Sequence, residues 1–171
     1  MLKQQHTAEE LAQLLNLLPH PEGGYYKEVY RSAGIIPQQA LGIGFSGDRN
    51  FATGIYFMLT GTNFSAFHRI KSDEGWHYYD GAPCHVYVIH TNGELEVIKL
   101  GRDIVNGEVF QAVVPAGAWF ASKCANADGY TLVGCTVSPG FDFADFEMAT
   151  RAALSAEYPQ HKAVIEMLTR D

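Results

Sequence analysis

Short, strand-like segments that alternate with turn signals fill the middle of the chain, from about residue 51 to residue 137. Asn92-Gly93 and Asn106-Gly107 are two such signals, and Pro115-Ala116-Gly117 is a third. An Asn-Gly pair between apolar segments favours a tight β-hairpin, because both residues tolerate positive φ. About nine short strands at this spacing predict an all-β sandwich or barrel, not alternating β-α units.

Helical patterns flank the strands at both ends of the chain. Thr7 and Glu10 fit a capping box ahead of regularly spaced leucines, so we expect a helix over about residues 8–18. Residues 149–169 predict one or two further helices. Residues 33–50 show no periodicity, and we expect a long loop there that is disordered or part of a subunit contact.

The size and composition fit one globular domain over residues 1–171, with the barrel at about 51–137. Hydrophobic residues make up 47% of the chain and charged residues 18%, which argues against a disordered protein. The net charge is -7 and no Lys/Arg cluster is present, so nucleic acid is not an expected partner.

The expected location is the cytoplasm. Cys84, Cys124 and Cys135 are odd in number and form no C-x-x-C pair, which indicates ordinary buried thiols in a reducing compartment. No segment reaches the roughly 18 continuous apolar residues of a membrane span. The first residues also lack the apolar core of a signal peptide, so we expect neither a membrane partner nor export.

The stretch from Phe64 to Gly81 brings His68, Glu74 and His77 close together in the sequence. Residues 64–70 alternate with a period of two, which is typical of a strand with two different faces. If Glu74 faces the same way as His68, the pair could hold a metal ion or carry out acid–base chemistry in a pocket.

The same period of two assigns faces to the residues after Glu74. Trp76 and Tyr78 should then point inward, and His77 should point outward. A bulge near Gly75 would reverse this order, because a glycine within a strand often marks a bulge.

These residues resemble the motifs of the cupins, which are small β-barrels of the jelly-roll type. His68, Glu74 and Gly81 fit the first cupin motif, and residues 115–120 fit the second, Pro-x-Gly-x-x-His, except that Phe120 replaces the histidine. The match covers about residues 52–137. It implies a double-stranded β-helix, the RmlC-like jelly roll.

The chain is still more similar to one cupin subgroup, called DUF985 or cupin_5. This resemblance covers nearly the whole chain and rests on the four segments HPEGGYYKEVYRS, HRIKSDEGWHYYDG, VPAGAWFAS and GCTVSPGFDFADF. It implies a jelly-roll barrel and a homodimer, for which residues 25–31 are our candidate contact strand. It implies no known reaction.

Cupin metal sites use three histidines and one glutamate, but Ile70 and Phe120 occupy two of the four positions here. Neither side chain can bind a metal, so we expect no metal cofactor. The alternative is a divalent transition metal such as Fe, Mn, Ni or Zn, bound by His68, Glu74 and His77.

Three functions remain open. The favoured one is a metal-free cupin that binds a small polar molecule, a sugar or nucleotide sugar, and epimerises or isomerises it. His68 would be its base beside Glu74, with Tyr78 or Tyr56 as the acid. The alternatives are a metal-dependent oxygenase or isomerase, and a non-catalytic ligand-binding or interaction module.

Further candidates for the pocket wall are mainly aromatic, since small-molecule sites often combine aromatic walls with few polar groups. They are Tyr56, Trp76, His77 and Phe120. Plain barrel core is an equally good interpretation of them. Glu28 and Arg31 could reach the pocket or a dimer contact, although a surface salt bridge is the favoured interpretation.

Overall fold

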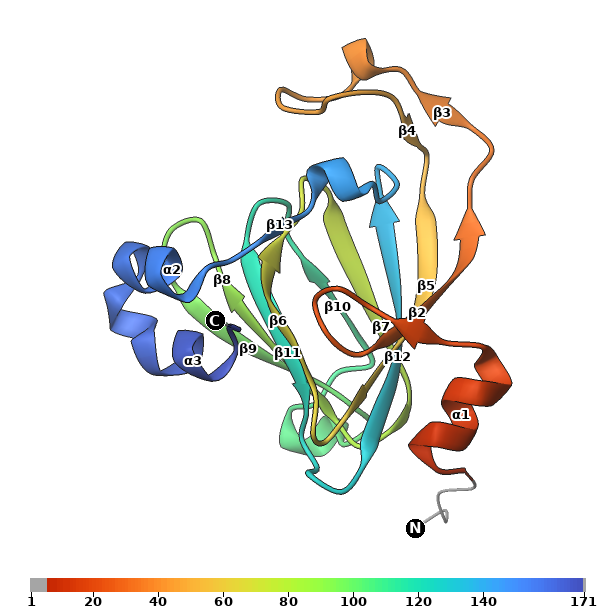
Figure 1. The fold of residues 1–171 in the computed structure, drawn as a ribbon, viewed down its shortest axis with the longest axis vertical. Helices are drawn as coiled ribbons and strands as arrows, with labels where there is room; N and C mark the ends of the chain where they lie inside the picture. The colour runs from red at the N-terminus through yellow and green to blue at the C-terminus, as the bar shows by residue number, and fades with distance from the viewer. Residues whose placement is uncertain (1–5, 171) are drawn as a thin grey trace.

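The computed structural model describes residues 6–170, and two antiparallel sheets form its body (Figure 1). The first sheet contains, in order, β1 (Leu18–Pro19), β2 (Tyr25–Arg31), β5 (Thr53–Thr60), β12 (Tyr130–Ser138), β7 (Asp73–Gly81) and β10 (Gln111–Val114). The second contains β13 (Glu147–Met148), β6 (Phe64–Arg69), β11 (Trp119–Cys124), β8 (Cys84–Ile89) and β9 (Leu95–Leu100). This two-sheet arrangement is the predicted jelly roll.

The facing sides of the two sheets enclose the main apolar core. Its fully buried side chains come from both sheets and include Phe57, Leu59, Trp76, Val88 and Phe120. The predicted hairpin at Asn92-Gly93 joins β8 to β9, and Gly93 has a φ of +86°. The turn therefore has the positive φ that the Asn-Gly pair predicted.

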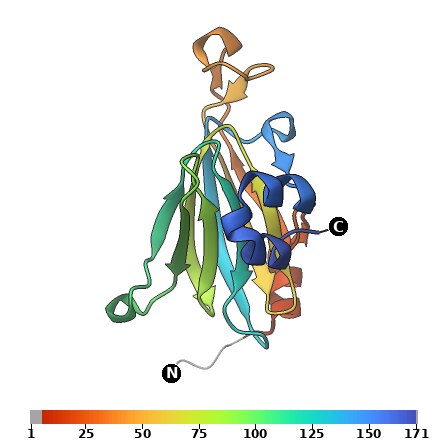
Figure 2. The same cartoon turned by 90° about the vertical axis from the view of Figure 1, so that its left-hand side faces the viewer.

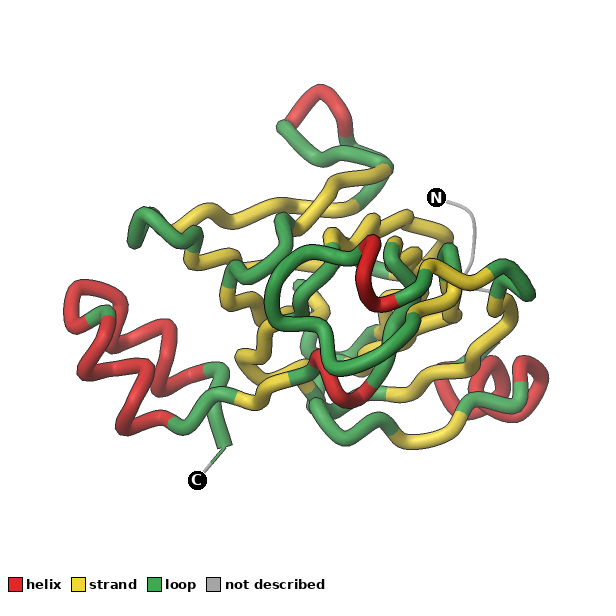
Figure 3. Tube along the Cα trace, turned by 90° about the horizontal axis from the view of Figure 1, so that it is seen from above, coloured by secondary structure: helices red, strands yellow, loops and turns green. Residues whose placement is uncertain are grey.

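The terminal helices cover the outside of the barrel, as Figures 2 and 3 show. The predicted capping box begins α1 (Ala8–Leu15), where Thr7 Oγ1 accepts from the Glu10 backbone N–H at 3.2 Å. This helix ends earlier than predicted, because Asn16 takes a left-handed conformation with a φ of +53°.

Both predicted C-terminal helices are present, as α2 (Arg151–Glu157) and α3 (Lys162–Met167), with the 3-10 turn η4 (Pro159–His161) between them. Leu154 and Ile165 on these helices pack with Phe67 and Trp119 on the outer side of the second sheet. None of the helices within residues 6–170 has the length and apolar character needed to cross a membrane.

The segment that we expected as a loop without regular structure is instead a hairpin arm. It contains β3 (Ile35–Ile36), η1 (Gln38–Ala40) and β4 (Arg49–Asn50), and it extends beyond the barrel in Figures 1 and 2. Each strand of the arm has only two residues, which is too short to give a periodic signal in the sequence.

A buried ion pair anchors the base of this arm. Arg49 donates from Nε and Nη2 to the two carboxylate oxygens of Asp145, at 2.6 and 2.7 Å. Asp145 belongs to η3 (Phe143–Asp145), in the segment that follows β12. Both side chains are only 4% exposed. The arm is therefore fixed to the segment at the upper end of the barrel.

Breaking this pair should destabilise the protein, because the remaining charge would be buried without its partner. We expect Asp145→Ala to lower the free energy of unfolding by about 2 kcal/mol, less than for a deep core pair because solvent lies close to the arm. The exposed Arg69–Glu147 pair gives the control Glu147→Ala, with an expected loss below about 1 kcal/mol. If urea denaturation gave the same loss of unfolding free energy for Asp145→Ala and Glu147→Ala, the anchoring role of the Arg49–Asp145 pair would be contradicted.

Candidate functional site

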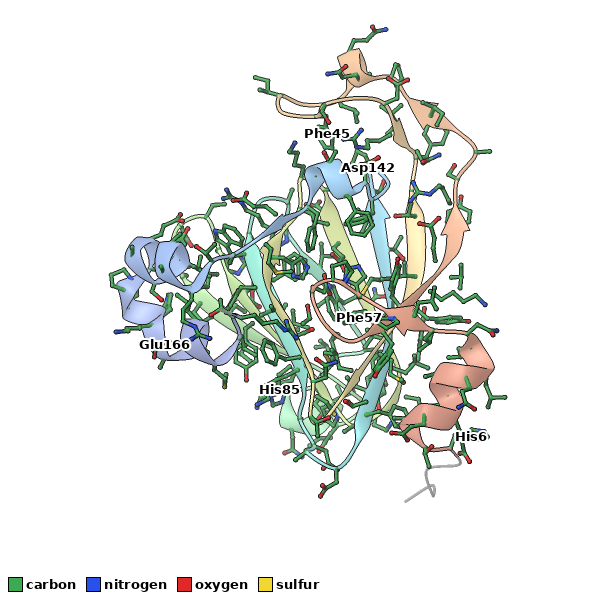
Figure 4. All side chains as sticks on the ribbon, viewed as in Figure 1. His6, Phe45, Phe57, His85, Asp142 and Glu166 are labelled. Carbon is green, nitrogen blue, oxygen red and sulfur yellow. The ribbon has the colours of Figure 1, made fainter. Side chains whose placement is uncertain are left out.

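A cavity of about 320 Å³ lies inside the barrel. Its wall combines side chains from β2, β5, β6, β7 and β12 with residues from the loop before β2 and the segment after β12. In Figure 4, two lining residues are labelled, Phe57 near the middle of the barrel and Asp142 toward its upper end. The lining residues are His20, Glu22, Tyr26, Glu28, Arg31, Thr53, Ile55, Phe57, His68, Ile70, Glu74, Cys135, Val137, Phe141, Asp142 and Phe143.

His68, on β6, is held by one backbone contact and two aromatic rings. Its Nδ1 lies 2.8 Å from the carbonyl oxygen of Ala66. Because a carbonyl can only accept, Nδ1 carries a proton, and Nε2 is the nitrogen that can gain or lose one. The imidazole packs against Phe120, with ring centroids 4.1 Å apart, and against Phe146 at 5.2 Å.

Glu22 is the partner of His68 Nε2. One carboxyl oxygen, Oε2, lies 3.1 Å from that nitrogen, and the other accepts a hydrogen bond from Ser65 Oγ at 2.8 Å. Burial raises the pKa of Glu22 to about 6 and lowers the pKa of His68. Both shifts favour the uncharged forms. Since Nδ1 carries the proton of the neutral imidazole, Nε2 presents a lone pair to Glu22 Oε2, and the 3.1 Å contact is favourable when a proton lies between them. Glu22 and His68 then share one proton, with the carboxylic acid donating to the neutral imidazole.

His20 extends this polar group on the other side of Glu22. Its Nδ1 accepts from the Glu22 backbone N–H at 3.3 Å and lies 3.4 Å from Glu22 Oε2. The edge of its ring meets Tyr26, with centroids 4.6 Å apart. Burial is the main cause of a lowered pKa for His20, so this imidazole is also favoured in its neutral form.

The loop that carries His20 and Glu22 is fixed across the barrel, as Figure 1 shows between β1 and β2. Gly23 has a φ of +111°, and a Cβ there would lie only 2.1 Å from the carbonyl oxygen of Phe64. Arg170 fastens the loop from the C-terminal end of the chain, donating to the Glu22 carbonyl at 2.6 Å and to the Phe64 carbonyl at 2.9 Å.

Glu74 projects into the cavity from β7 and is 8% exposed. Burial, and then the nearby carboxyl of Glu22, raise the pKa of Glu74 to about 7. Its hydrogen-bond partner is the thiol of Cys135 on the neighbouring β12. Burial keeps the pKa of Cys135 well above its usual range, so the thiol donates to the carboxyl. Glu74 can therefore exchange protons near neutral pH.

Glu28 and Arg31 form the predicted salt bridge and also line the cavity. Arg31 donates from Nε and Nη2 to the two Glu28 carboxylate oxygens, at 2.9 and 2.7 Å. It also donates from Nη1 to Asn50 Oδ1 at 2.8 Å and from Nη2 to the Phe141 carbonyl at 3.2 Å. Glu28 and Arg31 therefore form a salt bridge with each other and also line the pocket, as the two interpretations of the sequence suggested.

The structure brings His68 and Glu74 into one cavity but places Trp76 and Phe120 behind its wall. Both rings are 1% exposed, and their centroids lie 6.3 Å apart at a right angle. Phe120 supports the imidazole of His68 from the core side. The prediction that these two rings line the pocket is therefore wrong, although Trp76 does face inward.

The proposed tyrosine acids and His77 lie away from the cavity. Tyr78 donates its hydroxyl to the Gly81 carbonyl, and at four residues beyond Glu74 it lies about 13 Å along the strand. Tyr56 packs on Tyr79, with centroids 6.0 Å apart, outside the barrel interior. His77 lies 3.3 Å from Thr136 Oγ1 on the same outer side. Neither tyrosine can act together with His68.

These positions do not fit a cupin metal site. Ile70 lines the cavity and Phe120 packs on His68, so two of the four ligand positions are hydrocarbon. His68 Nε2 faces Glu22, and the alternative ligand His77 faces away. Within residues 6–170, no three His, Cys, Asp or Glu side chains are arranged to hold a metal ion. We therefore derive no chemical step through a metal.

Glu22 and His20 line the cavity although no motif in the sequence indicated them as site residues. Both lie in the segment HPEGGYYKEVYRS, as do Glu28 and Arg31. The signal was the glycine pair after Glu22, which predicts a tight bend. The sequence could not reveal that this bend brings the carboxyl of Glu22 back against β6.

The closed two-sheet architecture and the cavity between its sheets define a cupin-type barrel. A distant structural likeness to oxalate decarboxylase from Bacillus subtilis supports this fold, with a TM-score of 0.53 at 14% identity over 88% of this chain and 36% of that one. A family model described as Cupin superfamily (DUF985), Cupin_5, matches residues 9–149. The chain therefore belongs to the Cupin_5 family.

More similar relatives come from three different organisms. A hypothetical protein from Leishmania major has a TM-score of 0.89 at 40% identity, covering 97% of this chain and all of that one. A protein from Shewanella oneidensis has a TM-score of 0.85 at 41% identity, covering 96% and 98%. The uncharacterized protein YML079W of Saccharomyces cerevisiae is 35% identical over 147 residues, which are 79% of this chain and 73% of that protein.

The raised pKa of Glu74 should make stability depend on pH. In the unfolded chain its carboxyl ionises near 4.5, but in the folded protein it ionises only near 7. The stability contributed by keeping the acid protonated is thus complete below pH 4.5 and lost as the pH rises to 7. Relative to Glu74→Gln, the wild type should lose about 2 kcal/mol of unfolding free energy between pH 5 and pH 7.

Chemical denaturation of the wild type and of Glu74→Gln between pH 5 and pH 7 measures the difference in unfolding free energy. The contributions of His20 and His68 are present in both proteins and largely cancel in this difference. The exposed residue Glu9 on α1 lies outside the cavity and gives the control Glu9→Gln, which should show no such loss relative to the wild type. A pH-independent difference between wild type and Glu74→Gln would show that Glu74 titrates normally.

Proposed function

We propose that this protein is an isomerase or epimerase that moves a proton on a small polar, sugar-like molecule bound in the barrel. The observation that carries the proposal is the placement of Glu74 beside the proton-sharing pair of Glu22 and His68 in one cavity. Glu74 has a pKa of about 7, the range in which a group can both take and return a proton.

The proposed reaction begins with loss of a proton from a substrate carbon beside a carbonyl group. Ionised Glu74 accepts this proton, while the Glu22–His68 pair donates its shared proton to the carbonyl oxygen, which leaves a neutral enol. Protonated Glu74 then gives its proton to the neighbouring carbon, which yields an isomer, or to the opposite face of the same carbon after the enol has turned over in the cavity, which yields an epimer. In each route a hydroxyl group of the enol returns a proton to the Glu22–His68 pair as a carbonyl group re-forms, so Glu74 is again ionised and the pair is again protonated.

The apolar side chains beside these groups support the proposal. Phe57, Ile70 and Val137 line the cavity beside the polar side chains. An apolar environment strengthens hydrogen bonds to charge that develops during proton transfer. Metal-free chemistry is proposed because two ligand positions are hydrocarbon and His68 is engaged by Glu22.

Deuterium incorporation provides a test that needs no knowledge of the product. Candidate sugars and related polar carbonyl compounds would be incubated with the protein in D₂O and followed by NMR. We expect exchange at one carbon of a productive compound, and a loss of about 100-fold or more in Glu74→Gln and in Glu22→Gln. The surface variant Glu96→Gln should keep the wild-type rate.

Two outcomes would contradict this reaction. Exchange that persists unchanged in Glu74→Gln would remove Glu74 from the mechanism. Saturable binding of a carbonyl compound, with no exchange at any carbon, would instead favour the non-catalytic ligand-binding alternative.

We also propose that two copies of the chain pair through β2. β1 pairs only with Tyr25 and Tyr26, so residues 27–31 have β5 on one side and an open edge on the other within the described part of the chain. Val29 and Tyr30 on this strand are 52% and 55% exposed. An open edge with exposed apolar side chains favours pairing with another strand.

Light scattering coupled to size-exclusion chromatography tests this pairing. We expect twice the chain mass of 18.9 kDa for the wild type and a shift to the single mass for Val29→Asp. Val105, which is 96% exposed in the 3-10 turn η2 (Ile104–Asn106), provides the matched control Val105→Asp. A wild-type monomer at micromolar concentration would overturn the dimer.

A further inference from the structure

The charges around the cavity are strongly unequal. Among the described residues that line it, four carry carboxyl groups and one carries a guanidinium group. The carboxyl groups belong to Glu22, Glu28, Glu74 and Asp142, and the guanidinium group to Arg31. His20 and His68 add little positive charge, because burial favours their neutral forms. Arg31 balances the charge of Glu28, and Glu22 shares a proton with His68, so the excess negative charge belongs to Asp142 and to Glu74 when it is ionised. The cavity therefore presents a negative potential to a ligand that enters it near neutral pH.

Arg31 is poorly placed to receive an anion. Its Nε and Nη2 are bonded to Glu28, while Nη1 donates to Asn50 and Nη2 also donates to the Phe141 carbonyl. A phosphate or carboxylate would have to displace Glu28 from a two-point ion pair before it could bind. It would also meet the repulsion of the remaining carboxylates.

The carboxyl group of Asp142, unlike the guanidinium group of Arg31, is only partly engaged by hydrogen bonds. Its Oδ1 accepts from the Ala144 backbone N–H at 2.8 Å, which caps the short turn η3. In the described structure, Oδ2 has no hydrogen-bond donor of its own. The rings of Phe141 and Phe143 on either side in sequence meet edge to face, with centroids 5.0 Å apart, and both line the cavity.

This combination suits a cation more than an anion. The faces of aromatic rings attract ammonium groups electrostatically, and a carboxylate beside them completes the charge balance. Glu74 supplies a second carboxyl group deeper in the cavity, where the thiol of Cys135 is its hydrogen-bond donor. A ligand that carries a basic nitrogen could thus place it near Asp142 and extend toward Glu74.

We propose that the cavity selects a small polar ligand with a basic nitrogen, an amino sugar, and rejects phosphorylated and carboxylated analogues. The ammonium group lies against Asp142 and the rings of Phe141 and Phe143, and the remainder of the ligand reaches Glu74. This inference deepens the proposed function, since it names the substrate class for the same cavity.

Two matched compound sets test the ligand class by isothermal titration calorimetry. The first is glucosamine, glucose and glucose 6-phosphate. The second is 4-aminocyclohexanol, cyclohexane-1,4-diol and 4-hydroxycyclohexanecarboxylate. At neutral pH, where both amines are largely protonated and Glu74 is partly ionised, we expect the amine in at least one set to bind about tenfold or more tightly than its neutral partner. The anions should bind most weakly.

The Asp142→Asn variant should reduce the amine preference severalfold and leave binding of the neutral compounds unchanged. Asparagine remains a good N-cap, so η3 should keep its fold. Asp103 caps η2 in the same manner outside the cavity, and Asp103→Asn is the matched control. Glu28→Ala gives a second readout, because freeing Arg31 should raise the affinity for glucose 6-phosphate.

Equal or weaker binding of both amines relative to their neutral partners would overturn the inference, and so would the absence of any amine binding. An amine preference that Asp142→Asn leaves intact would overturn the assigned position. Deuterium exchange on neutral sugars alone, dependent on Glu74, would refute the ligand class and leave the proposed reaction standing. Amine-selective binding without deuterium exchange would support the ligand class and refute the proposed reaction.

Discussion

The contact between the Glu22 carboxyl and the His68 imidazole is the interaction on which the cavity depends. Each group alone would be costly to bury, and an ionised one more so. Sharing a single proton lets both remain uncharged, while Ser65 and the Ala66 carbonyl satisfy their other atoms. Glu74, whose hydrogen-bond donor is the Cys135 thiol, is then the buried carboxyl group in the cavity that is not paired with an imidazole.

The same contact explains how this cupin barrel keeps a polar interior with hydrocarbon at two of the four ligand positions of a cupin metal site. Ile70 and Phe120 make one side of the interior apolar, and Phe120 packs directly on the remaining histidine. Glu22, brought by a loop rather than by a barrel strand, then supplies the polar partner that a metal ion provides elsewhere in the superfamily. The N-terminal segment thus becomes part of the cavity wall.

Local sequence patterns predicted much of this molecule. The alternation along the strand correctly predicted that Glu74 and Trp76 face inward and His77 faces outward, and the capping box correctly predicted the start of α1. The alternation of residues along a strand failed to predict which inward residues reach the cavity, because it assigns a face of the sheet but no position along the barrel. Tyr78 shares the inward face with Glu74 and still lies away from the cavity. The alternation also could not find Glu22, whose role depends on a contact made far away in the sequence.

The contact of Arg170 with the Glu22 loop joins two residues that lie 148 positions apart in the sequence. It therefore cannot form before residue 170 has been synthesised and has reached the folded barrel. A chain shortened before this residue could form the two sheets and still lack an ordered carboxyl group at His68.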